Sequence, residues 1–201
     1  VFTSNLESAR QSNDGQHQAK ALINLGVVFL QQGFVNKALM QFETVKDHCT
    51  KAGDIPHLAV ALENLAVLHY RRQAFKQALF FYHRSAATSR RLGRIAQFST
   101  TILNLGDLYL TVGDVLKATR LADIARSYME RGKYRFLEPQ LLTLEGDIAA
   151  HREGYEQSAE FYERAESLIR AGSLSNQRLI PLLRAESELH LDHGHLDKAT
   201  Q

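Results

Sequence analysis

The stretch Ala21-Leu22-Ile23-Asn24-Leu25-Gly26 decides the fold, because related stretches follow it at a constant spacing of forty residues. Residues 61–66 read Ala-Leu-Glu-Asn-Leu-Ala, residues 101–106 read Thr-Ile-Leu-Asn-Leu-Gly, and residues 141–146 read Leu-Leu-Thr-Leu-Glu-Gly. Self-similarity at a fixed period is typical of repeat architectures, in which each unit buries its apolar face against its neighbours. The period therefore predicts a tandem array of similar structural units.

Each unit contains two helical patterns separated by a short break. Apolar and small residues recur at intervals of three and four in both halves of the first unit: Leu22, Leu25, Gly26 and Phe29, then Ala38, Phe42 and Val45. Gly53 and Gly93 are expected to close second helices, because glycine readily adopts a positive φ. Gly26 and Gly106 are expected to face the paired helix, where a larger side chain would push the two backbones apart.

The repeat register also predicts boundaries. Repeats are expected at about 19–53, 59–93, 99–133 and 139–173, with a partial repeat at 180–201. Residues 1–12 read as the tail of a second helix whose first helix is missing, and the chain stops just inside another second helix. We therefore expect residues 1–201 to form a single solenoid that is a piece of a longer protein, without the polar caps of terminal repeats.

The order of residue types resembles the tetratricopeptide repeat (TPR) family, with large–Leu–Gly–aromatic on the first helix and Ala–aromatic–Ala on the second. The resemblance covers essentially the whole chain. The period of forty, instead of the usual thirty-four, is similar to that of a longer-helix subgroup: kinesin light chains, Pins-type adaptors and MalT-type regulators. The resemblance implies an all-α fold, a right-handed superhelical α-solenoid of antiparallel helix pairs.

Composition narrows the classes of function. The 201 residues are 44% hydrophobic and carry a net charge of +2, so bulk charge indicates neither nucleic acid nor a membrane surface as the partner. No apolar run approaches the roughly 20 residues that span a bilayer, and no secretory signal opens the chain. Cys49 is the only cysteine, which fits a reducing compartment. We expect a cytoplasmic protein.

A second stripe on each first helix is expected to line the concave wall of the solenoid. The candidate peptide-binding residues are Lys20, Asn24, Val27, Asn64, Val67, Arg71, Asn104, Asp107, Asp147 and His151. Three of them, Asn24, Asn64 and Asn104, share one register, and an amide offers the donor and the acceptor that a peptide backbone requires. The resemblance implies a ladder of Asn residues that holds the ligand backbone. The alternative is that these amides cap or bridge neighbouring helices.

Charge is segregated along the chain. Residues 65–106 contain no Asp or Glu but seven basic residues: Arg71, Arg72, Lys76, Arg84, Arg90, Arg91 and Arg94. Residues 138–166 have the opposite balance, with eight acidic residues against Arg152 and Arg164. An acidic partner segment is one expectation for the basic region, and an ordinary solvated face is the other. Asp107 and Asp147 are expected either to receive a Lys or Arg of the ligand or to lie exposed without a partner.

The usual local signals of catalysis are missing, including the phosphate-binding, zinc-protease and nucleophile-elbow motifs. The residues His190, Asp192, His193 and His195 lie too close together in sequence for a tetrahedral site, so no metal and no cofactor are expected. The sequence predicts a non-catalytic module that binds a protein or peptide, with self-association through uncapped ends and binding to a domain of its own chain as further possibilities. The alternatives are a ligand-sensing domain of a larger regulator and a substrate-cradling enzyme subunit.

Overall fold

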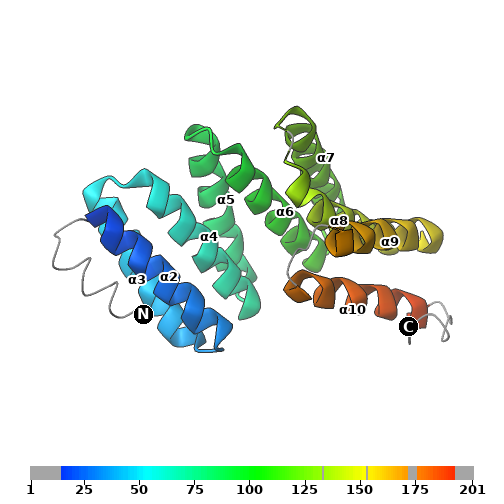
Figure 1. Cartoon of the computed structure of the whole chain (residues 1–201), viewed down its shortest axis with the longest axis horizontal. Helices are drawn as coiled ribbons and strands as arrows, with labels where there is room; N and C mark the ends of the chain where they lie inside the picture. The colour runs from blue at the N-terminus through cyan, green and yellow to red at the C-terminus, as the bar shows by residue number, and fades with distance from the viewer. Residues whose placement is uncertain (1–14, 133, 153, 172–175, 193–201) are drawn as a thin grey trace. The chain divides into compact units, whose positions relative to one another are not determined.

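The computed structural model describes residues 15–132, 134–152, 154–171 and 176–192, and these form helices with no strand among them. The helices follow one another along the chain in Figure 1: α2 (Gly15–Gln31), α3 (Val35–Ala52), α4 (Ile55–Arg71), α5 (Phe75–Arg91), α6 (Ile95–Thr111), α7 (Val115–Gly132), η1 (Arg135–Leu137), α8 (Glu138–Ala150), α9 (Tyr155–Ala171) and α10 (Asn176–Asp192). The chain divides into two compact units, Val1–Thr101 and Ile102–Gln201. The expected all-α architecture of tandem helix pairs is confirmed.

Short turns make the two helices of a pair antiparallel and hold them in contact. In the first unit α2 packs against α3, α4 packs against α5, and α3 also packs against α4. In the second unit α8 packs against α9, and α9 packs against α10. The first helices begin at Gly15, Ile55 and Ile95, earlier than the repeat starts predicted at 19, 59 and 99.

Helix ends follow the capping chemistry of the sequence. The Asp54 side chain accepts a hydrogen bond from the His57 backbone N–H at 3.2 Å, and Pro56 occupies the first turn of α4, where its missing N–H costs nothing. Gly53 ends α3 with φ of 68°, and Gly93 has φ of 66°. The expected positive φ at these two glycines is confirmed.

The turn between the helices of a pair needs a left-handed residue at one fixed position. Gly33 and Gly113 fill it with φ of 79° and 85°, whereas in the second repeat Gln73 fills it with φ of 57°. A residue with a Cβ pays about 1 kcal/mol or more for this conformation. Gln73 is therefore strained where its counterparts are not.

Replacing Gln73 by Gly is expected to raise the free energy of unfolding by about 0.5–1 kcal/mol, because relief of the left-handed strain exceeds the entropy cost of glycine. Arg72→Gly is the matched control, since Arg72 has φ of −89° and gains nothing from glycine. That control should lower the stability in chemical denaturation of the whole chain. An equal effect of the two variants would contradict the explanation.

The core of the first unit lies between the small residues of first helices and the aromatic residues of second helices. Phe42, Ala38 and Val45 are fully buried on α3. A Cβ added to Gly26 would lie 2.7 Å from Cε1 of Phe42, so only glycine lets this ring lie against α2. The expectation that Gly26 faces its paired helix is confirmed.

The third repeat solves the same packing problem differently. Ala122 stands where Phe42 and Tyr82 stand in earlier repeats, so α7 offers no ring to cover Gly106. Leu144 of the following first helix takes its place: a Cβ on Gly106 would lie 2.7 Å from its Cδ2 and 3.7 Å from Cβ of Leu121 on α7. Gly106 therefore contacts its paired helix through Leu121, as expected, but its nearest neighbour is Leu144 of the following first helix, because the paired helix carries a small residue at the aromatic register.

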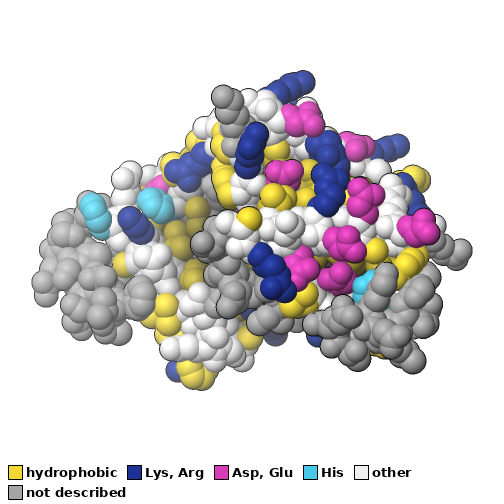
Figure 2. All heavy atoms as spheres, turned by 45° about the vertical axis from the view of Figure 1, so that its right-hand side comes forward, with side chains coloured by type: hydrophobic (Ala, Val, Ile, Leu, Met, Phe, Trp, Pro, Cys, Tyr) yellow, Lys and Arg dark blue, Asp and Glu magenta, His cyan; other side chains and the backbone are white. Residues whose placement is uncertain are grey.

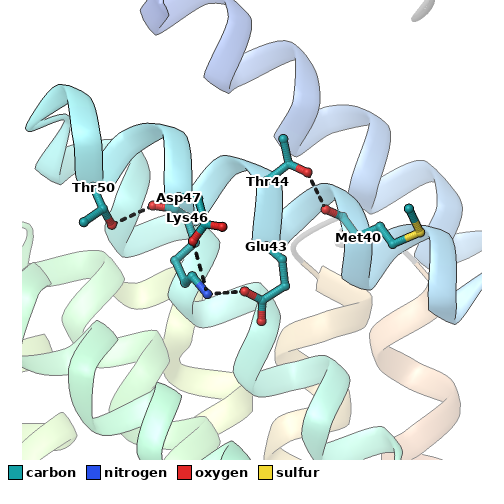
Figure 3. A network of polar contacts seen from close by, with 6 residues as sticks. All are labelled: Met40, Glu43, Thr44, Lys46, Asp47 and Thr50. Carbon is teal, nitrogen blue, oxygen red and sulfur yellow. Dashed lines mark hydrogen bonds and ion pairs between the residues drawn. The ribbon is translucent and has the colours of Figure 1, made fainter.

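One face of α3 satisfies its polar groups within the helix. Thr44 Oγ1 donates to the carbonyl of Met40 at 2.8 Å (Figure 3). The Lys46 ammonium pairs with Glu43 and lies 3.4 Å from Oδ1 of Asp47 in the same view. These contacts join residues one to four positions apart, so this face needs no neighbouring helix or partner to satisfy them.

Candidate functional site

The ten predicted binding residues all lie on first helices or at the end of one. In the first unit, α2 carries Lys20, Asn24 and Val27, and α4 carries Asn64, Val67 and Arg71; in the second unit, α6 carries Asn104 and Asp107, α8 carries Asp147, and His151 is its C-cap. Lys20, Asn24, Arg71 and His151 are exposed, and the other six are partly buried. The stripe therefore has the mixed burial of an accessible surface.

The Asn register has internal hydrogen bonds at two of its three positions. Asn64 Nδ2 donates to the carbonyl of Val60 at 2.9 Å, within its own helix. Asn104 Oδ1 accepts from Gln140 Nε2 at 2.7 Å, which bridges α6 and α8. A bridge between neighbouring helices is the structural role that the sequence also allowed here. A peptide held by Asn104 would have to share this amide with Gln140 or displace it.

The fourth position of the register is occupied by Leu144, which is 3% exposed. Leu144 belongs to a buried cluster that includes Ala122, Leu103 and Leu141. The amide pattern ends at this repeat because the space left by Ala122 requires an apolar side chain.

The second unit contains a cavity of about 460 Å³ built from four helices. Its lining is mixed: Asp107, Leu110, Thr111, Asp147, Ala150, His151, Tyr162, Ala185, Glu188 and Leu189. Three predicted binding residues, Asp107, Asp147 and His151, thus meet in one concave site. The seven others do not line this cavity.

A tyrosine from the paired helix organises the floor of this cavity. Tyr162 is 2% exposed, and its hydroxyl donates to Oδ1 of Asp147 at 2.6 Å. Burial and the Asp147 charge raise the pKa of Tyr162, so this hydroxyl remains a donor. In the sequence, Tyr162 stands 120 residues after Phe42, at the same register of the repeat, which indicates an aromatic core position and nothing more. The signal that sequence reasoning missed is that a buried phenol needs a hydrogen-bond partner.

The Asp147 carboxyl has an unusual protonation equilibrium. The pKa of Asp147 is raised to about 6, chiefly by burial. The charge of Asp107 adds to this rise, whereas the hydrogen bond from Tyr162 and the charge of His151 oppose it. The larger effect is burial, because the low local dielectric disfavours the ionised form. Among the described residues that line the cavity there is no Lys or Arg. A cation would therefore be stabilised beside Asp147.

Acidic side chains also gather on the surface around these helices. Figure 2 shows one face of the molecule, on which Asp and Glu side chains lie among hydrophobic side chains and Lys and Arg side chains. Their presence agrees with the acidic balance of residues 138–166. The seven basic residues of 65–106 are all exposed, and Arg71 alone among them belongs to the predicted stripe.

A second cavity, of about 700 Å³, lies elsewhere in the same unit. It is lined by Arg126, Met129, Glu130, Arg135, Glu138, Leu141, Leu142 and Arg164. Arg126 pairs with Glu145, whose pKa is raised by burial against the opposing effect of Arg126. Cationic and anionic groups offset one another around this cavity, so its charge selects no ligand.

The histidine group near the C-terminus has a structural role where it is described. His190 is buried, and its Nδ1 lies 2.9 Å from the Tyr155 hydroxyl. His193, His195 and the Asp192 side chain lie outside the described residues. Within the described part of the chain, no group of three or more His, Cys, Asp or Glu residues could hold a metal ion. None of the described helices has the length and apolarity to cross a membrane.

Comparison with known proteins adds a family match and several structural neighbours. Residues 17–91 match the model of the tetratricopeptide repeat family. A search of the curated proteins finds no significant match. The family model covers the first two helix pairs, α2 to α5, apart from the start of α2.

Three solved structures illustrate the neighbours. BtubC (BKLC) from P. vanneervenii has 16% identity and a TM-score of 0.74, over 99% of this chain and 84% of that chain. The TPR-like repeats of a putative kinesin light chain from Podosopora anserina have 16% identity and a TM-score of 0.61, over 90% of this chain and 89% of that one. The STAND protein PH0952 from Pyrococcus horikoshii, which has a TPR sensor, has 17% identity and a TM-score of 0.72, over 89% of this chain and 28% of that one.

Identities this low show a shared fold and no more. The forty-residue period, the helix pairs and the family match over residues 17–91 nevertheless agree with one another. Residues 17–91 match the tetratricopeptide repeat family, and the rest of the described chain continues the same fold of helix pairs.

Proposed function

We propose that the chain is a non-catalytic protein-interaction module that binds a segment of another polypeptide on the exposed faces of its first helices. The observation that supports this most directly is the cavity of the second unit, where Asp107, Asp147 and His151 come together from consecutive first helices. A concave site with apolar walls and a few convergent polar groups is the usual form of a binding site.

The Asn residues supply the second part of the proposal. Asn24 is exposed on α2, and Asn64 is partly buried on α4, which contacts α2 directly. An extended peptide crossing these helices would find amide donors and acceptors at one register. In the second unit, Asn104 offers the same groups only if its bond to Gln140 is shared or exchanged.

The double substitution Asn64→Ala and Asn104→Ala tests this part. A peptide is first selected from a random library displayed against the whole chain, and its affinity is then measured by calorimetry. We expect binding to weaken by about 1–3 kcal/mol through lost hydrogen bonds, with unchanged helix content in circular dichroism. Asn36→Ala is the matched control, since Asn36 is an exposed amide on a second helix.

Gln140→Ala separates a ligand role from a structural one at Asn104. This variant removes the bridge between α6 and α8 while it keeps the Asn104 amide. A loss of stability equal to that of Asn104→Ala, with peptide affinity unchanged in both, would assign Asn104 to helix bridging. The proposal would then be wrong at that position.

A second candidate is a sensor domain within a larger regulator. It is favoured by one neighbour, PH0952, whose TPR region is named a sensor and of which this chain covers 28%. In that case the segment bound on the first helices would belong to another domain of the same chain. Gel filtration of the full-length polypeptide, with and without a competing peptide, distinguishes a sensor domain from a module that binds another protein. In a sensor domain, the peptide would release the flanking domain and change the elution volume.

A further inference from the structure

We infer that the cavity of the second unit binds the guanidinium group of an arginine side chain presented by a partner polypeptide. The inference rests on the proposed function and names the chemical class that one part of the surface selects. Its evidence is the composition of the cavity walls, the hydrogen bond that orients the Asp147 carboxylate, and the absence of Lys and Arg among the described lining residues.

The walls of the cavity suit a long amphipathic side chain. Leu110, Ala150, Ala185 and Leu189 provide apolar surface, and Asp107 and Asp147 provide carboxylates in the same cavity. An arginine has three methylene groups that pack on apolar walls and a charged head that needs acceptors. A purely apolar side chain would bring no positive charge to the partly buried carboxylates, whereas an arginine head would.

Asp147 is oriented before any ligand arrives. The Tyr162 hydroxyl holds Oδ1 at 2.6 Å, and the Tyr162 ring is itself fixed by its contact with Gly146 on α8. Glu188 is a group of the rim, because it is exposed and its Oε1 lies 2.9 Å from Nε of Arg184. The carboxylates of Asp107 and Asp147 are therefore the two that would meet the head of a bound side chain.

A guanidinium fits this site better than an ammonium or a metal ion. It is more weakly hydrated than an ammonium, and it presents several donors in a planar fork that matches carboxylates. The described residues of the cavity do not include a set of side chains able to hold a metal ion. We therefore expect an arginine peptide to bind more tightly than its lysine equivalent.

Protons should compete with the arginine for Asp147. The titratable groups that line the cavity with Asp147 are Asp107 from α6, His151 at the end of α8, Tyr162 from α9 and Glu188 from α10, and the first three act on its pKa. The raised pKa of Asp147, about 6, means that acid neutralises it before most carboxylates. Lowering the pH from 7.5 to 5 should weaken binding about tenfold from this group alone.

The test uses the whole chain and a capped pentapeptide, Gly-Ser-Arg-Ser-Gly, as the probe. Binding is followed by amide chemical shifts of Asp147, Ala150 and His151 in low salt at about pH 7.5, where surface charges are weakly screened. The neutral isostere is the same peptide with citrulline. We expect saturable shifts with arginine, about tenfold weaker binding with citrulline and weaker binding at pH 5.

Three variants make the result specific. Asp147→Asn and Asp107→Asn should each weaken arginine binding about tenfold, and two sites protect the test against misfolding of one variant. Asp123→Asn removes the same charge from an exposed position of α7 outside the cavity and should change binding less than about twofold. Equal binding of citrulline, or an equal loss in Asp123→Asn, would overturn the inference.

The outcomes also separate this inference from the proposed function. If the arginine probe binds but the Asn variants do not change peptide affinity, the cavity remains a binding site and the Asn positions are not part of it. If library peptides without arginine bind and the arginine probe gives no saturable shifts, the inference of an arginine site is wrong. The proposed function as a protein-interaction module would still stand.

Discussion

Phe42→Ala is expected to lower the free energy of unfolding of the first unit by about 3–5 kcal/mol. Phe42 is fully buried on α3, and its ring lies directly over Gly26 of α2. Removing the ring leaves a cavity between two rigid helices, which close over it only partly. Chemical denaturation of the whole chain, followed by helicity, measures the change.

The chain itself suggests how to rescue this variant. In the second unit Ala122 replaces the aromatic residue, and Leu144 of the next first helix covers Gly106 instead. Asn64 is the residue of the second repeat that occupies the register of Leu144. Adding Asn64→Leu to Phe42→Ala should therefore recover about 1–2 kcal/mol, since contacting sites couple by 0.5–3 kcal/mol.

Asn64→Leu in the wild-type background is the control for this rescue. With Phe42 in place the space above Gly26 is already filled, so the added side chain should be neutral or destabilising. A gain of equal size in both backgrounds would show that the two positions are not coupled. The exchange of ring and leucine between repeats would then have another cause.

Gly146→Leu is expected to destabilise the second unit by about 3 kcal/mol, at the upper end of the usual cost of overpacking. A Cβ at this position would overlap Cε1 of the Tyr162 ring and lie 2.6 Å from its Cδ1. The ring has little freedom to move, because it is buried and its hydroxyl is bonded to Asp147. Ser167→Leu, at an exposed position of α9, adds a leucine without this overlap.

Two measurements check the prediction for Gly146. Hydrogen exchange of the amides in α8 and α9 should become faster in Gly146→Leu and remain unchanged in Ser167→Leu. Displacement of Tyr162 removes a hydrogen bond that lowers the pKa of Asp147 but also lets water reach the carboxyl; because burial is the larger effect, the pKa should move from about 6 toward its ordinary value. A stable variant with an unchanged Asp147 pKa would show that α8 and α9 separate at little cost.

The pattern of the fold was readable from the sequence at the level of repeats and turns. The series that begins with Leu22, Leu25 and Gly26 fixed the helix pairs, and the glycines at 53 and 93 marked the ends of second helices. Gln73 shows the limit of reading by residue type, because it adopts the left-handed turn conformation without being glycine. The register of the repeat, and not the residue, set that backbone.

The candidate site was readable only in part. Asp107, Asp147 and His151 were placed on one stripe by helical spacing, and they do line one cavity. Tyr162 was missed, because a core register says nothing about the partner of a buried hydroxyl. The hydrogen bond between Asn104 and Gln140 could not be predicted from the periodicity of one helix either, because the two residues are thirty-six positions apart.

The sequence by itself determined the helices, their pairing and the period, because each depends on residues within about one repeat and recurs in every unit. Tertiary structure decided which amide is bonded to which partner, why Leu144 interrupts the Asn register and how high the pKa of Asp147 rises. These properties arise from burial and fields contributed by several helices at once. In the second unit, Ala122 stands at the register of an aromatic ring and Leu144 at the register of an amide. That Leu144 fills the space left by Ala122 could therefore be recognised only in three dimensions.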